Sequence, residues 1–100
     1  MIDVQKNYLD KDGYPTDAAL EKIKTSDDFV ELLDFVSELF EEYGMARWDN
    51  KGEKRIYKLA TGGWSGNEEI IEAMRSNPIF WLECWYQTRR GGYYEFEVKL

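Results

Sequence analysis

The feature that most constrains the fold is a block of apolar residues at helical spacing in the first half of the chain. Asp27 and Asp28 precede this block, where they suit the positive end of a helix dipole, and Gly44 follows it as a typical helix end. The pattern predicts one amphipathic helix that must bury its apolar face against a second layer. The apolar residues are Phe29, Leu32, Leu33, Val36, Leu39, Phe40 and Tyr43.

Two hairpin patterns predict that second layer. The first consists of Met45–Trp48 and Lys54–Ala60 on either side of a polar turn. The second consists of Ile79–Thr88 and Tyr93–Lys99, which are rich in aromatic and β-branched residues and flank a Gly-Gly turn. We therefore expect an antiparallel sheet.

Two further helices complete the predicted fold. Thr16 caps the first, over about 17–24. The second runs from Ser65 to about Ser76, with Ser65 and Glu68 in a capping-box pattern, and Pro78 stops it. The predicted order is ααββαββ, an α+β fold with helices packed on one face of the sheet. A chain of 100 residues suits a single globular domain, 1–100.

The loop of the last hairpin decides which side chains face the core. A two-residue loop would put Glu95 and Glu97 on the Cys84 face, and an odd-length loop would put an apolar set there. We favour the odd loop because it gathers the apolar residues on one face. That face then holds Tyr94, Phe96 and Val98, and the outer face holds Trp81, Trp85 and Tyr93 with Glu83, Glu95 and Glu97.

The composition excludes several function classes. The chain has 20 acidic and 13 basic residues, a net charge of -7, which argues against direct binding of nucleic acid. It has no His, and its one cysteine, Cys84, lies among apolar residues that predict an inert core thiol. We expect no catalytic residues, no metal and no cofactor, and hence no enzyme. The sequence shows no signal peptide and no membrane-spanning run, so we expect a cytoplasmic protein.

The acidic residues concentrate in one stretch. Between Thr25 and Ala46 there are seven Asp and Glu and no Lys or Arg. Five of them form one stripe on the predicted helix, roughly 16 Å long and spaced by about 4 Å, close to the ~3.4 Å axial phosphate spacing of a DNA strand. The stripe is either a solvated face that keeps the chain soluble or a phosphate-like track, bare of cations, for a basic groove of a partner. The acidic stripe consists of Glu31, Asp34, Glu38, Glu41 and Glu42.

Aromatic and arginine residues of the last hairpin are the other candidate partner-binding residues. Tryptophan, tyrosine and arginine dominate the energetics of protein interfaces. The alternatives are that the aromatic residues are core and that the arginines only solubilise a turn. An unpaired strand edge could also form a homodimer. The candidates are Trp81, Trp85, Arg89, Arg90 and Tyr93.

The second half of the chain resembles a group of small uncharacterised proteins from phages, prophages and bacterial mobile elements. The likeness rests on Gly62–Ile71, Phe80–Trp85 and Arg89–Tyr93, and covers about the last 40 residues. The resemblance carries no catalytic residues. It implies a phage protein that inhibits host machinery, as anti-CRISPR and anti-restriction proteins do.

These observations predict a small acidic interaction protein that acts as a nucleic-acid mimic. Its partner would be a basic host protein that handles nucleic acid in defence, and the chain would contact neither nucleic acid nor membrane itself. One alternative is an immunity protein that neutralises a basic toxin. Another is a small-ligand or enzymatic domain that uses the Trp81 and Trp85 face or a pocket near Trp64.

Overall fold

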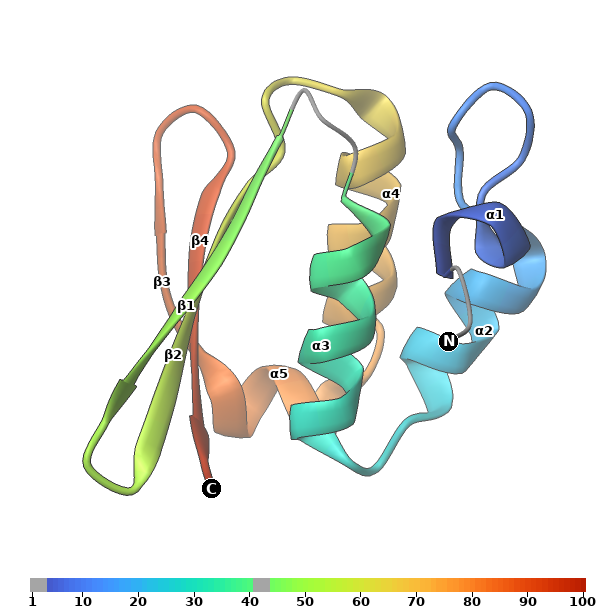
Figure 1. Ribbon diagram of the computed structural model, residues 1–100. Helices are drawn as coiled ribbons and strands as arrows, with labels where there is room; N and C mark the ends of the chain where they lie inside the picture. The colour runs from blue at the N-terminus through green and yellow to red at the C-terminus, as the bar shows by residue number, and fades with distance from the viewer. Residues whose placement is uncertain (1–3, 41–43) are drawn as a thin grey trace.

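The computed structural model describes residues 4–40 and 44–100 and has the predicted α+β architecture. A four-stranded antiparallel sheet, in the order β1-β2-β4-β3, carries the helices on one face (Figure 1). Helices α3 and α4 lie beside the sheet, α5 crosses one end of it, and α1 and α2 lie further out. The elements are α1 (Val4–Tyr8), α2 (Asp17–Thr25), α3 (Phe29–Leu39), β1 (Met45–Lys51), β2 (Lys54–Ala60), α4 (Ser65–Arg75), α5 (Pro78–Cys84), β3 (Trp85–Arg89) and β4 (Tyr93–Lys99).

Side-chain caps begin α2 and α3; the Thr16 cap is as predicted, whereas α3 is capped by Asp28, which the sequence favours only through the helix dipole. Thr16 Oγ1 accepts a hydrogen bond from the Ala19 amide at 3.2 Å, and Asp28 Oδ1 accepts one from the Glu31 amide at 3.0 Å. These bonds satisfy amide groups that have no partner inside the helix. None of the described helices is long and apolar enough to cross a membrane.

Helix α3 is shorter than its apolar pattern predicts. It ends at Leu39, because Phe40 turns into an extended conformation with φ -61° and ψ 129°. Gly44 therefore does not cap it, and Tyr43 lies outside the described residues. The apolar face of α3 is buried, with Leu32, Leu33, Phe35, Val36 and Leu39 in the core.

The sheet buries alternate residues against the helices. Tyr57 and Leu59 of β2 lie opposite Phe96 and Tyr94 of β4, and Tyr57, Leu59 and Phe96 are completely buried. This alternation follows from the two-residue period of a strand. The predicted first hairpin is confirmed, and its strands continue to a tight turn at 52–53.

The last hairpin has the odd loop that burial favours. Arg89 pairs with Tyr93, which leaves three residues, 90–92, in the loop. Phe96 and Val98 are accordingly buried, and Tyr94 packs against the core. A bulge interrupts the register between residues 85 and 87, at the start of β3.

The predicted strand over 79–88 is wrong in its first half, which forms α5. Pro78 occupies the first turn of this helix, where a missing amide is tolerated. Phe80 and Cys84, four residues apart, face the core, whereas Ile79 and Leu82 are 62% and 84% exposed. This is a helical period, which the unbroken apolar run 78–82 conceals.

The helix α5 also changes the predicted position of Trp81. Its ring packs edge-on against Tyr94 and Phe96, at 6.4 and 5.5 Å between centroids, on the helix-facing side of the sheet. The prediction that Trp81 and Trp85 share the outer face with Tyr93 is therefore wrong, because Trp85 pairs with the buried Phe96 and stacks on Trp81. Phe80 stays in the core, as the strand prediction expected. The helical turn brings Trp81 against the same core.

Helix α4 matches its predicted range but not its predicted cap. Trp64 is the N-cap residue and makes no side-chain capping bond, and Ser65 is already the first helical residue. The Ser65 hydroxyl lies 2.7 Å from the Tyr14 hydroxyl, so it links the helix to the loop before α2. Within residues 4–40 and 44–100, α1 and α5 are two short helices that the sequence does not predict.

Candidate functional site

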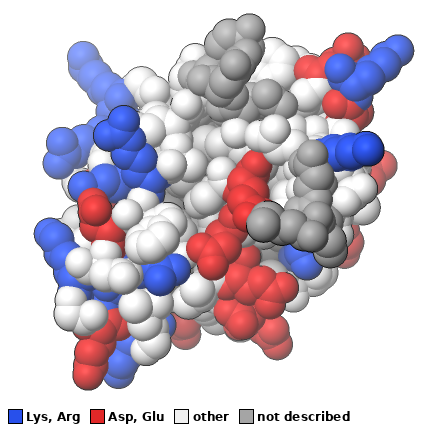
Figure 2. All heavy atoms as spheres, in the orientation of Figure 1, with Lys and Arg blue, Asp and Glu red and all other residues white. Residues whose placement is uncertain are grey.

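Helix α3 presents the described part of the acidic stripe on one exposed face. Glu31, Asp34 and Glu38 span roughly 10 Å at 1.5 Å per residue. Figure 2 shows acidic side chains gathered at the middle of the face that is turned to the viewer, over α3. Glu41 and Glu42 lie outside the described residues.

The first acid of the stripe has a cationic neighbour from another helix. Lys22 of α2 places its Nζ 3.8 Å from Glu31 Oε1 and 5.3 Å from the centroid of the Phe35 ring. The lysine is therefore held by a loose ion pair and a cation–π contact. The expectation of a stripe bare of cations is wrong at Glu31, because helix packing brings in a residue distant in sequence.

Asp34 is also paired, and it links α3 to the sheet. The Tyr57 hydroxyl donates a 2.5 Å hydrogen bond to Asp34 Oδ1 and accepts one of 3.2 Å from Arg55 Nη1. Arg55 Nη1 lies 3.8 Å from the Asp34 carboxylate, and its guanidinium stacks 4.1 Å over the Trp48 ring. The expectation of bare acids is thus wrong at Asp34 too, whose role is partly structural.

Sequence reasoning missed Lys22 and Arg55. Nothing local in the sequence pairs Lys22 with Glu31, since they lie on different helices. Arg55 had a signal: it alternates with Tyr57 and Leu59 along β2, which places it on the helix-facing side of the sheet.

The network around Tyr57 makes a pH-dependent contribution to stability. Burial first, and then the hydrogen bond to Asp34, raise the pKa of Tyr57 from 10.0 to about 12. The native state therefore holds the phenol proton more tightly than the unfolded chain does. The resulting stabilisation is complete below about pH 10 and is lost as the pH rises through about 12.

We expect Tyr57→Phe to remove that pH dependence. Urea unfolding followed by circular dichroism measures the free energy of unfolding at each pH. We choose about pH 9, below the pKa of tyrosine in the unfolded chain, and about pH 11.5, between that pKa and the pKa of Tyr57 in the native state. The free energy of unfolding should fall less between these pH values in Tyr57→Phe than in the parent. Tyr86→Phe, at an exposed tyrosine, is the matched control. Equal falls in the parent and both variants would contradict the prediction.

Glu38, by contrast, makes no ion pair with any residue in 4–40 or 44–100. It borders a hollow of about 250 Å³ between α1, α2 and α3, which we call the acidic groove. Aromatic and aliphatic side chains contribute to this groove, and Tyr8 meets Phe35 edge-on at 4.9 Å. Its lining residues are Val4, Tyr8, Lys22, Glu31, Asp34, Phe35 and Glu38.

Charge is divided between the two layers of the fold. The sheet segments 45–60 and 85–100 hold eight Lys and Arg and four Asp and Glu, whereas the rest of the chain holds five and sixteen. Figure 2 shows basic side chains concentrated at the left, where Figure 1 places the sheet. The helical half of the molecule is therefore strongly anionic and the sheet half is cationic.

The other candidate binding residues lie away from the acidic stripe. Trp81 and Trp85 stack at 6.1 Å with an interplanar angle of 11°, and Arg89 lies 5.9 Å over the Tyr93 ring. Arg90 is in the exposed hairpin loop. These residues belong to α5, β3, the last hairpin loop and the start of β4, whereas Asp34 contacts β2. The structure does not join the two sets into one site.

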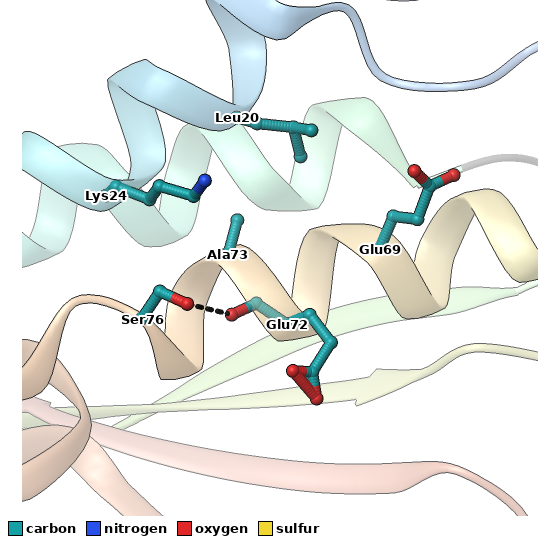
Figure 3. Close-up of a pocket in the computed structure, with 6 residues that line it drawn as sticks. All are labelled: Leu20, Lys24, Glu69, Glu72, Ala73 and Ser76. Carbon is teal, nitrogen blue, oxygen red and sulfur yellow. Dashed lines mark hydrogen bonds between the residues drawn. The ribbon is translucent and has the colours of Figure 1, made fainter.

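A second hollow, of about 190 Å³, lies between α2 and α4 (Figure 3). Leu20 and Lys24 of α2 face Ala73 of α4 across it. Ser76 Oγ donates to the Glu72 carbonyl at 3.0 Å, and the Glu72 carboxylate pairs with Arg75 at 3.2 Å. Ser76 and Glu72 therefore bond within α4, and Lys24 and Glu69 are the other charged side chains that line the hollow.

Cys84 is buried, and its surroundings favour the neutral thiol. Burial, and to a lesser degree Glu83, raise the pKa of the Cys84 thiol to about 11, so it stays protonated at neutral pH. Among residues 4–40 and 44–100, no three metal-ligating side chains group together. Comparison with protein-family models, with curated proteins and with solved structures gave no significant match. The resemblance to phage proteins therefore stays a prediction.

Proposed function

We propose that this chain is a non-catalytic binding protein whose acidic groove and stripe occupy a basic surface of another protein. The proposal depends most on the observation that the described acids of the stripe stay accessible to solvent despite their ion pairs. The side chains of Glu31 and Asp34 are 65% and 50% exposed, and both ion pairs are long at 3.8 Å. A charge-assisted hydrogen bond is about 2.7–2.9 Å, so these cations do not cap the carboxylates.

The division of charge between the layers supports this proposal. An anionic helical half attracts a basic partner over a longer range than individual contacts do, and it speeds association. The cationic sheet half would be repelled by the same partner. The arrangement therefore favours one docking orientation, with α3 toward the partner.

A nucleic-acid-handling protein is the partner class that fits best. Such proteins carry basic surfaces for phosphates. The described acids are about 5 Å apart along α3, wider than the ~3.4 Å axial spacing of phosphates, so we base the proposal on charge rather than on copied geometry. A cytoplasmic phage inhibitor of host defence, of the anti-CRISPR or anti-restriction kind, is the biological role that we propose with it.

The test compares two double variants with the same change in net charge. Glu31→Gln/Glu38→Gln removes acids of the stripe, and Glu68→Gln/Glu69→Gln removes exposed acids of α4. Asp34 is left intact because it holds Tyr57. After the partner is identified by pull-down and mass spectrometry, titration gives its Kd for each variant.

We expect the stripe variant to bind about 5- to 30-fold more weakly at low salt, because each interfacial charge contributes on the order of 0.5–1 kcal/mol. The α4 variant should stay within about twofold of the parent. The stripe effect should shrink at high salt. Equal weakening by both variants, with both folds intact by circular dichroism, would show that the stripe is not the contact surface.

A further inference from the structure

We propose that the acidic groove is a subsite for one lysine or arginine side chain of the partner, and that Lys22 occupies this subsite in the free protein as an internal competitor. This inference rests on the proposed function and specifies what the groove binds. Lys22 is the cation that already lies against this groove.

The contacts of Lys22 show which chemistry the groove accepts. Its ammonium lies 5.3 Å from the centroid of the Phe35 ring and 3.8 Å from Glu31. An aromatic face beside a carboxylate is a favourable environment for a primary ammonium or a guanidinium. Tyr8 holds the Phe35 ring edge-on at 4.9 Å, so the aromatic surface is fixed before a ligand arrives.

The groove has the size and charge to hold one cationic side chain in the position that Lys22 takes. Its volume of about 250 Å³ is below the range of ~300–1,000 Å³ for small-molecule sites, so it suits a single side chain. Glu38 stands at its border with no ion pair to a described residue. Asp34 is already engaged by Arg55 and Tyr57, so Glu31 and Glu38 are the two carboxylates of the groove that remain for Lys22 or for an incoming cation.

Lys22 is held weakly enough to be displaced. Its side chain is 41% exposed, and its distance to Glu31 exceeds that of a hydrogen-bonded pair. Exposed ion pairs of this kind contribute little to stability. An incoming arginine offers the same charge with a planar group that stacks on aromatic rings, so it can replace Lys22 in the groove while Lys22 moves into solvent.

The experiment compares Lys22→Gln with Lys24→Gln. Both residues are exposed lysines of α2, so the two variants have the same net charge, but Lys24 does not line the groove. The probe is a hexa-arginine peptide, and hexa-citrulline is its neutral control. Isothermal titration calorimetry or fluorescence anisotropy at low salt gives the Kd for each protein. Circular dichroism confirms the fold of each variant.

We expect Lys22→Gln to bind hexa-arginine about two- to fivefold more tightly than Lys24→Gln does, and hexa-citrulline to bind neither. The double variant Lys22→Gln/Glu38→Gln should lose that gain. Equal Kd values for Lys22→Gln and Lys24→Gln would overturn the internal competition, even if both bind the peptide. Absence of binding to every variant would overturn the subsite, whereas the proposed function is tested separately with the natural partner.

Discussion

Replacing Asn77 by alanine is expected to lower the free energy of unfolding by about 2–4 kcal/mol, the largest effect of any single side chain considered. Asn77 is 6% exposed, and its amide joins two parts of the fold. Nδ2 donates to the carbonyl oxygens of Ile23 and Ser26, at 3.0 and 2.9 Å, at the end of α2. Oδ1 accepts from the Phe80 amide at 3.3 Å and so caps α5.

Alanine would remove all three bonds at once. Unsatisfied buried polar groups cost about 1–3 kcal/mol, and loss of a helix cap costs about 1 kcal/mol. The variant Asn77→Ser separates the two parts, because a serine hydroxyl can still cap α5 but does not reach α2. Urea unfolding should place Asn77→Ser between the parent and Asn77→Ala. An Asn77→Ala protein as stable as the parent would show that Asn77 does not hold α2 against α5.

Gly44→Ala is expected to destabilise the protein by about 3 kcal/mol, at the upper end of the range for overpacking. A Cβ at this position would lie 2.6 Å from the Ala60 carbonyl oxygen and 2.6 Å from Asn67 Nδ2. One of these atoms belongs to the backbone of β2, and Asn67 is buried and donates to the Thr61 carbonyl. The first atom cannot retreat without disturbing the end of β2, and the second cannot retreat without disturbing the start of α4.

Gly63→Ala is the matched control for Gly44→Ala. Gly63 has φ +76° but nothing within 4 Å of an added Cβ, so alanine there meets only backbone strain of about 1 kcal/mol. Gly44 has no positive φ, so alanine there meets only a lack of space. Urea unfolding with unchanged m-values should rank Gly44→Ala as the less stable variant. The reverse order would show that the β1 start adapts to the extra methyl group.

The sequence was sufficient for the layers of the fold because local patterns determine them. The period of Leu32, Val36 and Leu39 requires a helix with one buried face, and the alternation of Tyr57 and Leu59 requires a strand with one buried face. The helix α5 was not predictable in this way. Five consecutive apolar residues have no polar face, and only the contacts of the fold decide between helix and strand.

The sequence predicts where the acidic residues of the site lie on α3, but it does not predict which cations lie beside them. The spacing of Glu31, Asp34 and Glu38 places them on one face of a helix whatever the tertiary structure. Their partners Lys22 and Arg55 come from α2 and β2, and only packing brings them within 4 Å. A stripe without nearby cations in sequence is therefore weak evidence for a stripe without cations in space.

The opposite charges of the helical and sheet halves give the molecule a permanent electric dipole that runs between its two layers. A body with net negative charge and such a dipole experiences both attraction and torque near a cationic surface. It rotates during its approach, before any side chains touch. Partner selection then begins at distances of a Debye length, about 8 Å at physiological salt, where the shape of the surface has no influence.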